Sequence, residues 1–532
     1  MQRHVFNILR ARVASVKHIP NSKHPANLQL HHNRPCITNS FNHTLDATPP
    51  RQVSPSIHNT HHESSVEHMK RKHQHISADN LVRNRPVFSA DNIVKSNIPD
   101  LTIPKDLPFH EFVFEKCDQF KNNVALEEFL SGKTCTYGQL KASSLRVASG
   151  LHKHGLRKGD VALIFSTNCI EFAVLMLACA RIGVCISPAN PIFTPGELCL
   201  QLSNGGATAV FTSESLADIA TKAMEKKTFE HVTHRFVFGE APGFDNFHRL
   251  LEDNGSSLPV VNFDPVNDML TMPYSSGTTG LPKGVMLTHY NCLANVLQSA
   301  GGLDIKESDV ALGLLPLYHI YGMMVIQYGV LNVGGTVIYM PKFEPDTFLR
   351  CIQDKKITLA FLVPPLVVFM AKHPMCANFD LTSVSRVFCG AAPLGADITI
   401  EFKEKYDHVH RFCQGYGLTE TSPLTNLDTT QTIGCAGSMV ANTVGKIVDI
   451  ETGKTLGPHQ DGEVCVKGPQ VMKGYFNNKK ATDGMLDVDG WMSTGDIGYF
   501  DEEGKLYIKD RLKELIKYKG SQVNNDHTYE YI

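Results

Sequence analysis

Short apolar runs alternate with amphipathic stretches along most of the chain after Asp100. Val161–Phe165 and Val184–Pro188 have the length and composition of buried strands, and Ile170–Ile182 between them has those of a helix. A strand, a helix and a second strand in this order predict a parallel βαβ unit. The pattern recurs at Ala209–Phe211, Thr336–Tyr339, Leu359–Val363 and Val387–Phe388, with an amphipathic stretch at Thr347–Gln353. The sequence therefore predicts an α/β fold of layered, mostly parallel sheets covered by helices.

The pattern changes beyond Gly445, where apolar residues alternate over shorter distances. Glu463–Lys467 and Lys505–Ile508 have the composition of short strands, and Asp501–Gly504 that of a turn. This part of the chain predicts a β-rich subdomain on the same folding unit.

Residues 1–90 have little apolar periodicity, and 12 of the 25 histidines fall before Ile76. Such a segment buries too little surface to offset its ordering entropy, so we expect a disordered, histidine-rich extension. The first 45 residues contain no acidic residue but carry scattered arginines and lysines among apolar residues, a composition similar to a transit peptide. A mitochondrial targeting segment and an unstructured basic extension both fit. Without targeting, an intracellular protein of the cytosol or peroxisome is expected.

The composition favours a small-molecule partner and an intracellular compartment. A net charge of −2 gives no reason to expect nucleic acid or an anionic membrane, so the partner is expected to be a small molecule. The 14 cysteines stand singly, many within apolar runs, which predicts reduced core thiols in an intracellular compartment. The apolar run Phe172–Ala180 is far shorter than the roughly 20 residues of a membrane-spanning helix.

A glycine- and hydroxyl-rich segment is the most informative part of the sequence. It runs from Ser275 through Ser276, Gly277, Thr278, Thr279 and Gly280 to Lys283. Glycines allow backbone N–H groups to converge on an anion, and hydroxyls with one ammonium add donors and positive charge. The segment lacks the Gly-Lys-Ser/Thr ending of a Walker loop. It predicts a triphosphate-binding loop, and a Gly/Ser-rich surface loop is the alternative.

This segment resembles the signature of the adenylate-forming (AMP-binding) superfamily, which includes acyl-CoA synthetases, 4-coumarate:CoA ligases and luciferases. Other blocks agree in order and spacing, with the 4-coumarate:CoA ligase branch most similar. They are Asn97–Pro104, Leu315–Tyr321, Gly390–Gly395, Gln414–Glu420, Ser493–Asp496 and Asp510–Gly520. The resemblance implies an ATP-dependent carboxylic acid:CoA ligase that acts through an acyl-adenylate, with ATP, Mg²⁺ and CoA as its small molecules. The acid would be a fatty or aryl-propenoic acid such as 4-coumarate.

The resemblance also assigns roles to single residues. The loop residues hold the β- and γ-phosphates, Glu420 binds Mg²⁺ and Thr419 contacts the α-phosphate. An exposed pair at a helix start is the alternative for Thr419 and Glu420. The ribose is assigned to Asp496 and Arg511. Asp496 is expected where a strand ends in a glycine-flanked turn, and stabilising that turn is its alternative role. Gly390, Ala391, Gln414, Gly415 and Tyr416 line the adenine slot.

His319 is assigned to the substrate carboxylate, with a core histidine as the alternative. The acyl pocket is assigned to Tyr321, Val325, Phe388, Pro423 and Leu424, whose bulk suggests an apolar acyl or aryl group. Lys342, Lys519 and Gly520 correspond to CoA contacts, Lys513 to a hinge, and Lys517 and Gln522 to residues that orient the reacting groups.

The resemblance ends near Val523. We expect residues 91–512 to form the large AMP-binding domain, and residues 513–532 to hold the hinge and a shortened start of the family's C-terminal lid domain. Since a lid excludes water and supplies charge, weak or no ligase turnover is expected without it. A non-catalytic nucleotide- or acyl-binding isoform and a luciferase-like monooxygenase are the alternatives.

Overall fold

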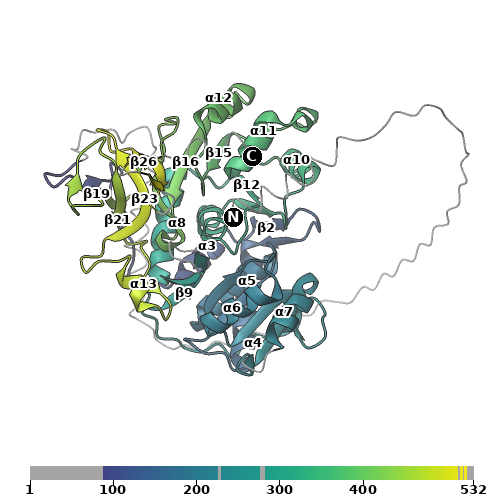
Figure 1. Ribbon diagram of the computed structural model, residues 1–532. Helices are drawn as coiled ribbons and strands as arrows, with labels where there is room; N and C mark the ends of the chain where they lie inside the picture. Colours follow the sequence, from purple (N-terminus) through teal and green to yellow (C-terminus); the bar gives the residue numbers. More distant parts are fainter. Residues whose placement is uncertain (1–87, 226–228, 276–281, 513–515, 519–520, 524–532) are drawn as a thin grey trace, which may run out of the picture. The chain divides into compact units, whose positions relative to one another are not determined.

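The computed structural model describes residues 88–225, 229–275, 282–512, 516–518 and 521–523 (Figure 1). The chain divides into two units after Asn80, and every described residue lies in the second unit. The histidine-rich extension expected for residues 1–90 lies outside the described residues except for its last three positions.

The first sheet contains the βαβ unit predicted from the sequence. Strands β4 (Val161–Phe165) and β5 (Cys185–Ala189) pair in parallel, and α5 (Ile170–Ile182) connects them. The strand order is β10-β11-β9-β5-β4-β6-β7-β8, with β22 paired to β11. The remaining strands are β6 (Ala209–Ser213), β7 (His234–Phe238), β8 (Asp245–Asn246), β9 (Met269–Thr271), β10 (Tyr274–Ser275), β11 (Lys283–Thr288) and β22 (Gly474–Tyr475).

Both faces of this sheet are covered at β4, which explains why this strand is apolar throughout. Along β4, Ala162 and Ile164 join one buried cluster, whereas Val161, Leu163 and Phe165 join another. Helices α6 (Pro195–Gly205) and α7 (Ala217–Met224) pack on each other and contact β5 and β6.

The second sheet is parallel at its centre, as predicted. Its order is β18-β17-β16-β15-β14-β12-β13-β2-β3. The parallel strands are β2 (Val124–Glu128), β12 (Val310–Gly313), β13 (Thr336–Tyr339), β14 (Leu359–Leu362), β15 (Arg386–Cys389) and β16 (Arg411–Gly417). The antiparallel edges are β3 (Thr134–Thr136), β17 (Leu424–Leu427) and β18 (Ser438–Met439).

Helices fill the space between these two sheets. Each of α5 and α8 (His289–Leu303) contacts strands of both sheets, and α3 (Phe109–Gln119) packs on α5, α8 and α4 (Tyr137–Lys153). Thr136 and Thr288 are the N-cap residues just before α4 and α8, and each forms a capping box that satisfies N–H groups of the first turn. The other helices are α9 (Gly329–Leu331), α10 (Pro345–Asp354), α11 (Pro364–Lys372), α12 (Ala396–Lys405) and α13 (Lys479–Asp483). Short 3₁₀ helices are η3 (Glu214–Leu216), η5 (Phe247–Glu252), η7 (Pro374–Asn378) and η8 (Thr419–Thr421).

The third sheet is the predicted β-rich subdomain, with order β1-β19-β21-β23-β24 and β20 paired to β19. Its strands from the C-terminal part are β19 (Val444–Val448), β20 (Thr455–Leu456), β21 (Gly462–Lys467), β23 (Met492–Phe500) and β24 (Leu506–Arg511). The prediction missed β1 (Val94–Lys95), which pairs with β19 from the other end of the described chain. Strands β25 (Ile516–Tyr518) and β26 (Ser521–Val523) form a separate hairpin.

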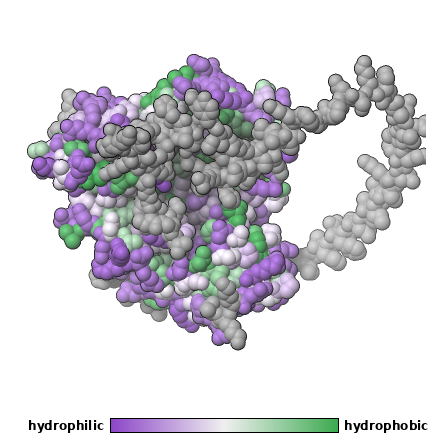
Figure 2. All heavy atoms as spheres, in the orientation of Figure 1, coloured by the Kyte–Doolittle hydropathy of each residue, from purple (hydrophilic) through white to green (hydrophobic). Residues whose placement is uncertain are grey.

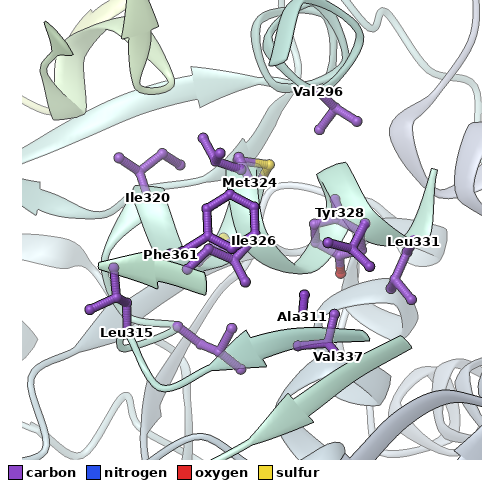
Figure 3. Close-up of a cluster of buried hydrophobic side chains, with 14 of the residues drawn as sticks. Val296, Ala311, Leu315, Ile320, Met324, Ile326, Tyr328, Leu331, Val337 and Phe361 are labelled. Atoms are coloured by element: carbon purple, nitrogen blue, oxygen red, sulfur yellow. The ribbon is translucent and has the colours of Figure 1, made fainter. Parts of the chain in front are cut away.

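A π-helix, η6 (Tyr321–Tyr328), follows β12 and was not predicted. Its side chains lie between Val296 of α8 and residues Ala311 and Val337 of the second sheet (Figure 3). Because a π-helix has more residues per turn than an α-helix, side chains four apart lie on nearly the same face. Single π-turns occur frequently at functional sites.

Two buried polar groups in this scaffold bear on stability. Arg386 forms an ion pair with Asp309 and donates to the carbonyl of Asp304, and both charged side chains are almost fully buried. On α3, His110 is completely buried beside His289, and neither ring nitrogen of His110 has a hydrogen-bond partner among the described residues. Burial, with His289 and Arg181 nearby, lowers the pKa of His110 to about 2, and burial lowers that of His289 to about 4.

The described cysteines are unpaired and, apart from the half-buried Cys169, buried, as expected for core thiols. None of the described helices has both the length and the apolar composition that crossing a bilayer requires. On the face shown in Figure 2, exposed hydrophobic residues occur in small patches among hydrophilic ones.

Candidate nucleotide and acyl site

The glycine- and hydroxyl-rich segment joins two strands of the first sheet. Ser275 ends β10 and lies opposite Lys283, the first residue of β11, in an antiparallel pair. Ser276, Gly277, Thr278, Thr279 and Gly280 lie outside the described residues. The structure thus shows that strands flank the segment on both sides, and the conformation of the segment itself stays a prediction.

The Glu420 carboxylate accepts a hydrogen bond from the first residue of this segment. Glu420 lies in η8, just after β16, and its side chain is buried. The hydroxyl of Ser275 donates to Glu420 Oε1 over 2.7 Å, and the hydroxyl of Tyr475 donates to the same oxygen over 2.7 Å. The alternative of an exposed pair at a helix start is therefore wrong for Glu420. Its neighbour Thr419 is partly exposed.

Tyr475 was missed by the sequence analysis, because the pair Gly474-Tyr475 carries no motif that points to Glu420, which lies far away in the chain. Lys283 Nζ lies over the Tyr475 ring, 5.3 Å from its centroid. Burial, and then the Glu420 carboxylate, raises the pKa of the Tyr475 hydroxyl far above its ordinary value. This hydroxyl is therefore a permanent donor at neutral pH.

A second cluster joins the second and third sheets. Tyr416, near the end of β16, donates its hydroxyl to Asp496 Oδ2 over 2.7 Å. Arg511 Nε lies 3.3 Å from Asp496 Oδ1, and the two residues are directly opposite each other in β23 and β24. Burial, and then the Asp496 charge, raises the pKa of Tyr416 well above its usual range. The sequence predicted all three residues, but not this mutual contact.

Asp496 lies inside β23 rather than where a strand ends, so that expectation is corrected. The pairing of β23 with β21 shifts register across residues 493–497, and Gly495 has a φ of 72°. This is a β-bulge, and glycine allows its left-handed conformation. Gly495 N–H donates to Glu463 Oε1, and Asp496 N–H donates to Thr494 Oγ1. Bulges of this kind re-aim a side chain beside a functional site.

The other nucleotide candidates follow the carboxyl ends of parallel strands. Gly390 and Ala391 come directly after β15, and Gln414 and Gly415 belong to the end of the neighbouring β16. A Cβ at Gly390 would lie 3.4 Å from the Gly415 carbonyl oxygen, so the backbones run close together. In open α/β sheets, this edge is where ligands bind.

The acyl candidates gather at the same edge. Tyr321 and Val325 lie four apart in η6, and Tyr321 donates to the Phe388 carbonyl over 3.4 Å. Phe361 of β14, which the sequence analysis missed, packs between the Tyr321 and Phe388 rings at centroid distances of 6.3 and 5.7 Å. Pro423 and Leu424 follow η8, and the Ser422–Pro423 peptide bond is cis.

His319 precedes η6 in the loop after β12. Its Nε2 is buried with no hydrogen-bond partner among the described residues, and burial lowers its pKa to about 4. A neutral imidazole with an unsatisfied nitrogen is suited to a polar ligand, although the same features fit the core-histidine alternative.

For the candidate CoA, hinge and orienting residues, the described contacts include none to the two carboxylate clusters. Lys342 is exposed and pairs with Glu344 over 2.8 Å. Lys517 and Gln522 lie opposite each other in the β25–β26 hairpin. Lys513, Lys519 and Gly520 lie outside the described residues.

The oxygens of Glu420 and Ser275 are suitable ligands for a magnesium ion that is bound mainly by phosphates. Magnesium prefers oxygen ligands and uses one or two carboxylates together with substrate phosphates. Glu420 supplies one carboxylate next to the Ser275 hydroxyl, and the described residues contain no cluster of three or more His, Cys, Asp or Glu ligands. A metal cage made of protein alone is therefore not present in this part of the chain.

Known proteins match this fold over most of the chain. Residues 113–476 match the model of the family described as AMP-binding enzyme. The chain is 39% identical to 4-coumarate--CoA ligase 5 of Oryza sativa subsp. japonica, over 81% of this chain and 80% of the rice protein. It is 40% identical to 4-coumarate--CoA ligase CCL1 of Humulus lupulus with the same two shares.

Solved structures agree with this result. ATP-bound MatB from Rhodopseudomonas palustris has a TM-score of 0.70 and 29% identity, over 78% of this chain and 81% of that one. The luciferase-like enzyme from the nonluminescent mealworm Zophobas morio has a TM-score of 0.71 and 26% identity, over 80% of this chain and 100% of that one. The resemblance inferred from the motifs is confirmed: this chain belongs to the AMP-binding enzyme family.

Proposed function

We propose that this chain is an acid:CoA ligase that activates a carboxylic acid with ATP through an acyl-adenylate. The carboxylate oxygen of the acid attacks the α-phosphorus of ATP, and pyrophosphate leaves. The thiol of CoA then attacks the acyl carbonyl carbon, the bond to AMP breaks, and the acyl-CoA thioester forms. The observation that carries the proposal is the hydrogen bond from Ser275 to Glu420, which joins the phosphate loop to the carboxylate beside the parallel strands.

In the first step, different side chains bind different phosphates of ATP and the magnesium ion. Ser275 and Lys283, together with residues 276–280, bind the β- and γ-phosphates, and Thr419 contacts the α-phosphate. Glu420 holds the Mg²⁺ that neutralises charge on the phosphate oxygens. Because negative charge builds up on those oxygens during the attack, fixed donors and cations there lower the barrier.

The nucleotide and the acid occupy neighbouring parts of the same edge. Asp496 and Arg511 bind the ribose, and Gly390, Ala391, Gln414, Gly415 and Tyr416 enclose the adenine. His319 meets the carboxylate of the acid. The acid extends along Tyr321, Val325, Phe388, Pro423 and Leu424.

For the acid we propose an aryl-propenoic acid such as 4-coumarate, with fatty acids as the second class to test. Two observations support this choice. The rice and hop relatives are named 4-coumarate--CoA ligases. The rings of Tyr321, Phe361 and Phe388 form one packed group, and aromatic pairs of this kind favour a flat ring next to them.

Pyrophosphate release with a panel of carboxylic acids tests the proposal, with CoA thioester formation measured in parallel. The wild-type chain should release pyrophosphate only with ATP and an accepted acid, and Lys283→Ala should lower that rate. The control is Lys479→Ala, which removes an exposed lysine that pairs with Asp483 on α13. Absence of both pyrophosphate release and ATP binding would overturn the proposal. The expectation of weak turnover stays a prediction, which the same assay tests.

The cellular location, mitochondrial or else cytosolic or peroxisomal, also stays a prediction. Imaging of residues 1–45 fused to a fluorescent reporter distinguishes a mitochondrial location from the cytosolic and peroxisomal alternatives.

A further inference from the structure

Tyr475 contacts two candidate phosphate-site residues at once, one with its hydroxyl and one with its ring. The hydroxyl donates to Glu420 Oε1 over 2.7 Å, and Lys283 Nζ lies 5.3 Å from the ring centroid. The Tyr475 side chain is only 3% exposed, so both contacts are made from the protein interior. A cation over an aromatic face is attracted by the ring, and a hydroxyl bonded to a carboxylate is a strong hydrogen bond.

The backbone around Tyr475 is tied to the elements that carry both partners. Tyr475 and Gly474 pair with Val285 and Met286 of β11, the strand that begins at Lys283. Met472 N–H donates to the carbonyl of Glu420 over 2.8 Å. Residues 472–475 therefore fix the distance between the lysine-bearing strand and the 3₁₀ turn that bears the carboxylate.

Helix α13 holds the backbone at Tyr475 through Thr482. Tyr475 N–H donates to Thr482 Oγ1 over 2.9 Å. Gly474 has a φ of 144°, and a Cβ there would lie 2.7 Å from Thr482 Cγ2. The close approach of this turn to α13 therefore requires glycine before the tyrosine.

Ser275 and Tyr475 both bind Glu420 Oε1, but they differ in what a nucleotide would do to them. Ser275 belongs to the segment assigned to the phosphates, so its hydroxyl can turn toward a phosphate oxygen. Tyr475 belongs to β22, which is paired with β11, so its side chain is anchored to the sheet rather than to the phosphate segment. Because both hydroxyls bind Oε1, neither of these two bonds occupies Oε2, which a cation could use.

We propose that Tyr475 is a positioning residue of the adenylation site, which orients the Glu420 carboxylate toward Mg²⁺ with its hydroxyl and holds the Lys283 ammonium with its ring. This proposal rests on the proposed function, because it assigns Glu420 to the metal and Lys283 to the phosphates.

Tyr475→Phe tests the hydroxyl while keeping the ring. The measurement is ATP affinity by titration calorimetry, first in EDTA and then over a series of Mg²⁺ concentrations. Loss of a charge-assisted hydrogen bond predicts a rise of about tenfold in the Mg²⁺ concentration that gives half of the affinity gain. The affinity in EDTA should change by less than about twofold, because the contact of Lys283 with the ring remains.

The matched control is Tyr137→Phe. Tyr137 is fully buried and donates its hydroxyl to the Gly335 carbonyl over 2.7 Å, far along the chain from the site. This control reports what the loss of one buried tyrosine hydrogen bond does to thermal unfolding. It should leave the Mg²⁺ dependence unchanged.

Two further variants separate positioning from a general structural role. In a Glu420→Gln background, Tyr475→Phe should produce no further change in Mg²⁺ dependence, because the hydroxyl acts through that carboxylate. Tyr475→Leu removes the ring as well and should also weaken ATP binding in EDTA. An unchanged Mg²⁺ dependence in Tyr475→Phe overturns the inference, as does an equal loss of affinity with and without Mg²⁺. Failure of the wild-type chain to bind ATP instead overturns the proposed function itself.

Discussion

Asp496→Asn removes the charge at the junction of the second and third sheets. The buried carboxylate accepts the Tyr416 hydroxyl over 2.7 Å and lies 3.3 Å from Arg511 Nε. The Arg511 side chain is 63% exposed, so this ion pair adds less than about 1 kcal/mol to folding. An asparagine oxygen can still accept the tyrosine hydroxyl, but its NH₂ group then faces the guanidinium. We expect the free energy of unfolding to fall by only about 1 kcal/mol.

The effect on nucleotide binding should be larger than the effect on folding. If the carboxylate accepts both ribose hydroxyls, loss of its charge weakens two charge-assisted hydrogen bonds, for a total of about 2 kcal/mol. This corresponds to roughly 30-fold weaker binding of both ATP and AMP. Because AMP lacks the β- and γ-phosphates, an equal loss for the two ligands locates the effect at the nucleoside.

Titration calorimetry with ATP and AMP gives the affinities, and urea unfolding gives the stability. Asp461→Asn is the control, because Asp461 lies in the same subdomain, is exposed and pairs with Lys509 over 2.6 Å. It should change neither quantity measurably. An Asp496→Asn protein that binds AMP within threefold of the wild type would refute the ribose assignment.

Three other substitutions test separate parts of the argument. Lys283→Ala should weaken ATP binding about tenfold and AMP binding hardly at all, since only ATP carries the outer phosphates; calorimetry with both nucleotides decides it. Arg386→Met should lower the free energy of unfolding by about 3–5 kcal/mol in urea titrations, because it leaves the Asp309 charge buried without its partner. The buried, neutral His110 and His289 have pKa values below the ordinary histidine value of 6.5, so the unfolded chain binds more protons than the folded one at acidic pH. Their contribution to stability is present above pH 6.5 and is lost as the pH falls toward about 4 and below, and His110→Leu should reduce this acid sensitivity in unfolding measured between pH 4 and 7.

The sequence predicted those parts of the fold that depend on local pattern. The strand Val161–Phe165 and the helix Ile170–Ile182 have the bounds that their apolar runs suggested, because a parallel sheet covered on both faces requires continuous apolar strands. The phosphate segment was recognised from its composition. Its glycines and hydroxyls interrupt an apolar pattern that continues on either side.

The parts that could not be predicted depend on contacts between distant residues. Val94 pairs with Gly445, and no periodicity in a two-residue strand could reveal that partner. The bond between Tyr475 and Glu420 likewise exists only once β22 has paired with β11. The π-helix Tyr321–Tyr328 differs from an α-helix by a single residue per turn, which an apolar run does not encode.

The candidate site takes its side chains from all three sheets: Lys283 from the first, Tyr416 from the second and Asp496 from the third. No single βαβ unit could therefore bind the nucleotide as proposed, and the cross-sheet contacts decide whether the site exists at all. Two of them are side-chain hydrogen bonds to buried carboxylates, from Tyr475 to Glu420 and from Tyr416 to Asp496. Each bond therefore orders a carboxylate that the proposed function needs, Glu420 for Mg²⁺ and Asp496 for the ribose, without neutralising its charge. Tyrosine suits this position better than lysine or arginine, because its hydroxyl orients a carboxylate while leaving its full charge for the ligand.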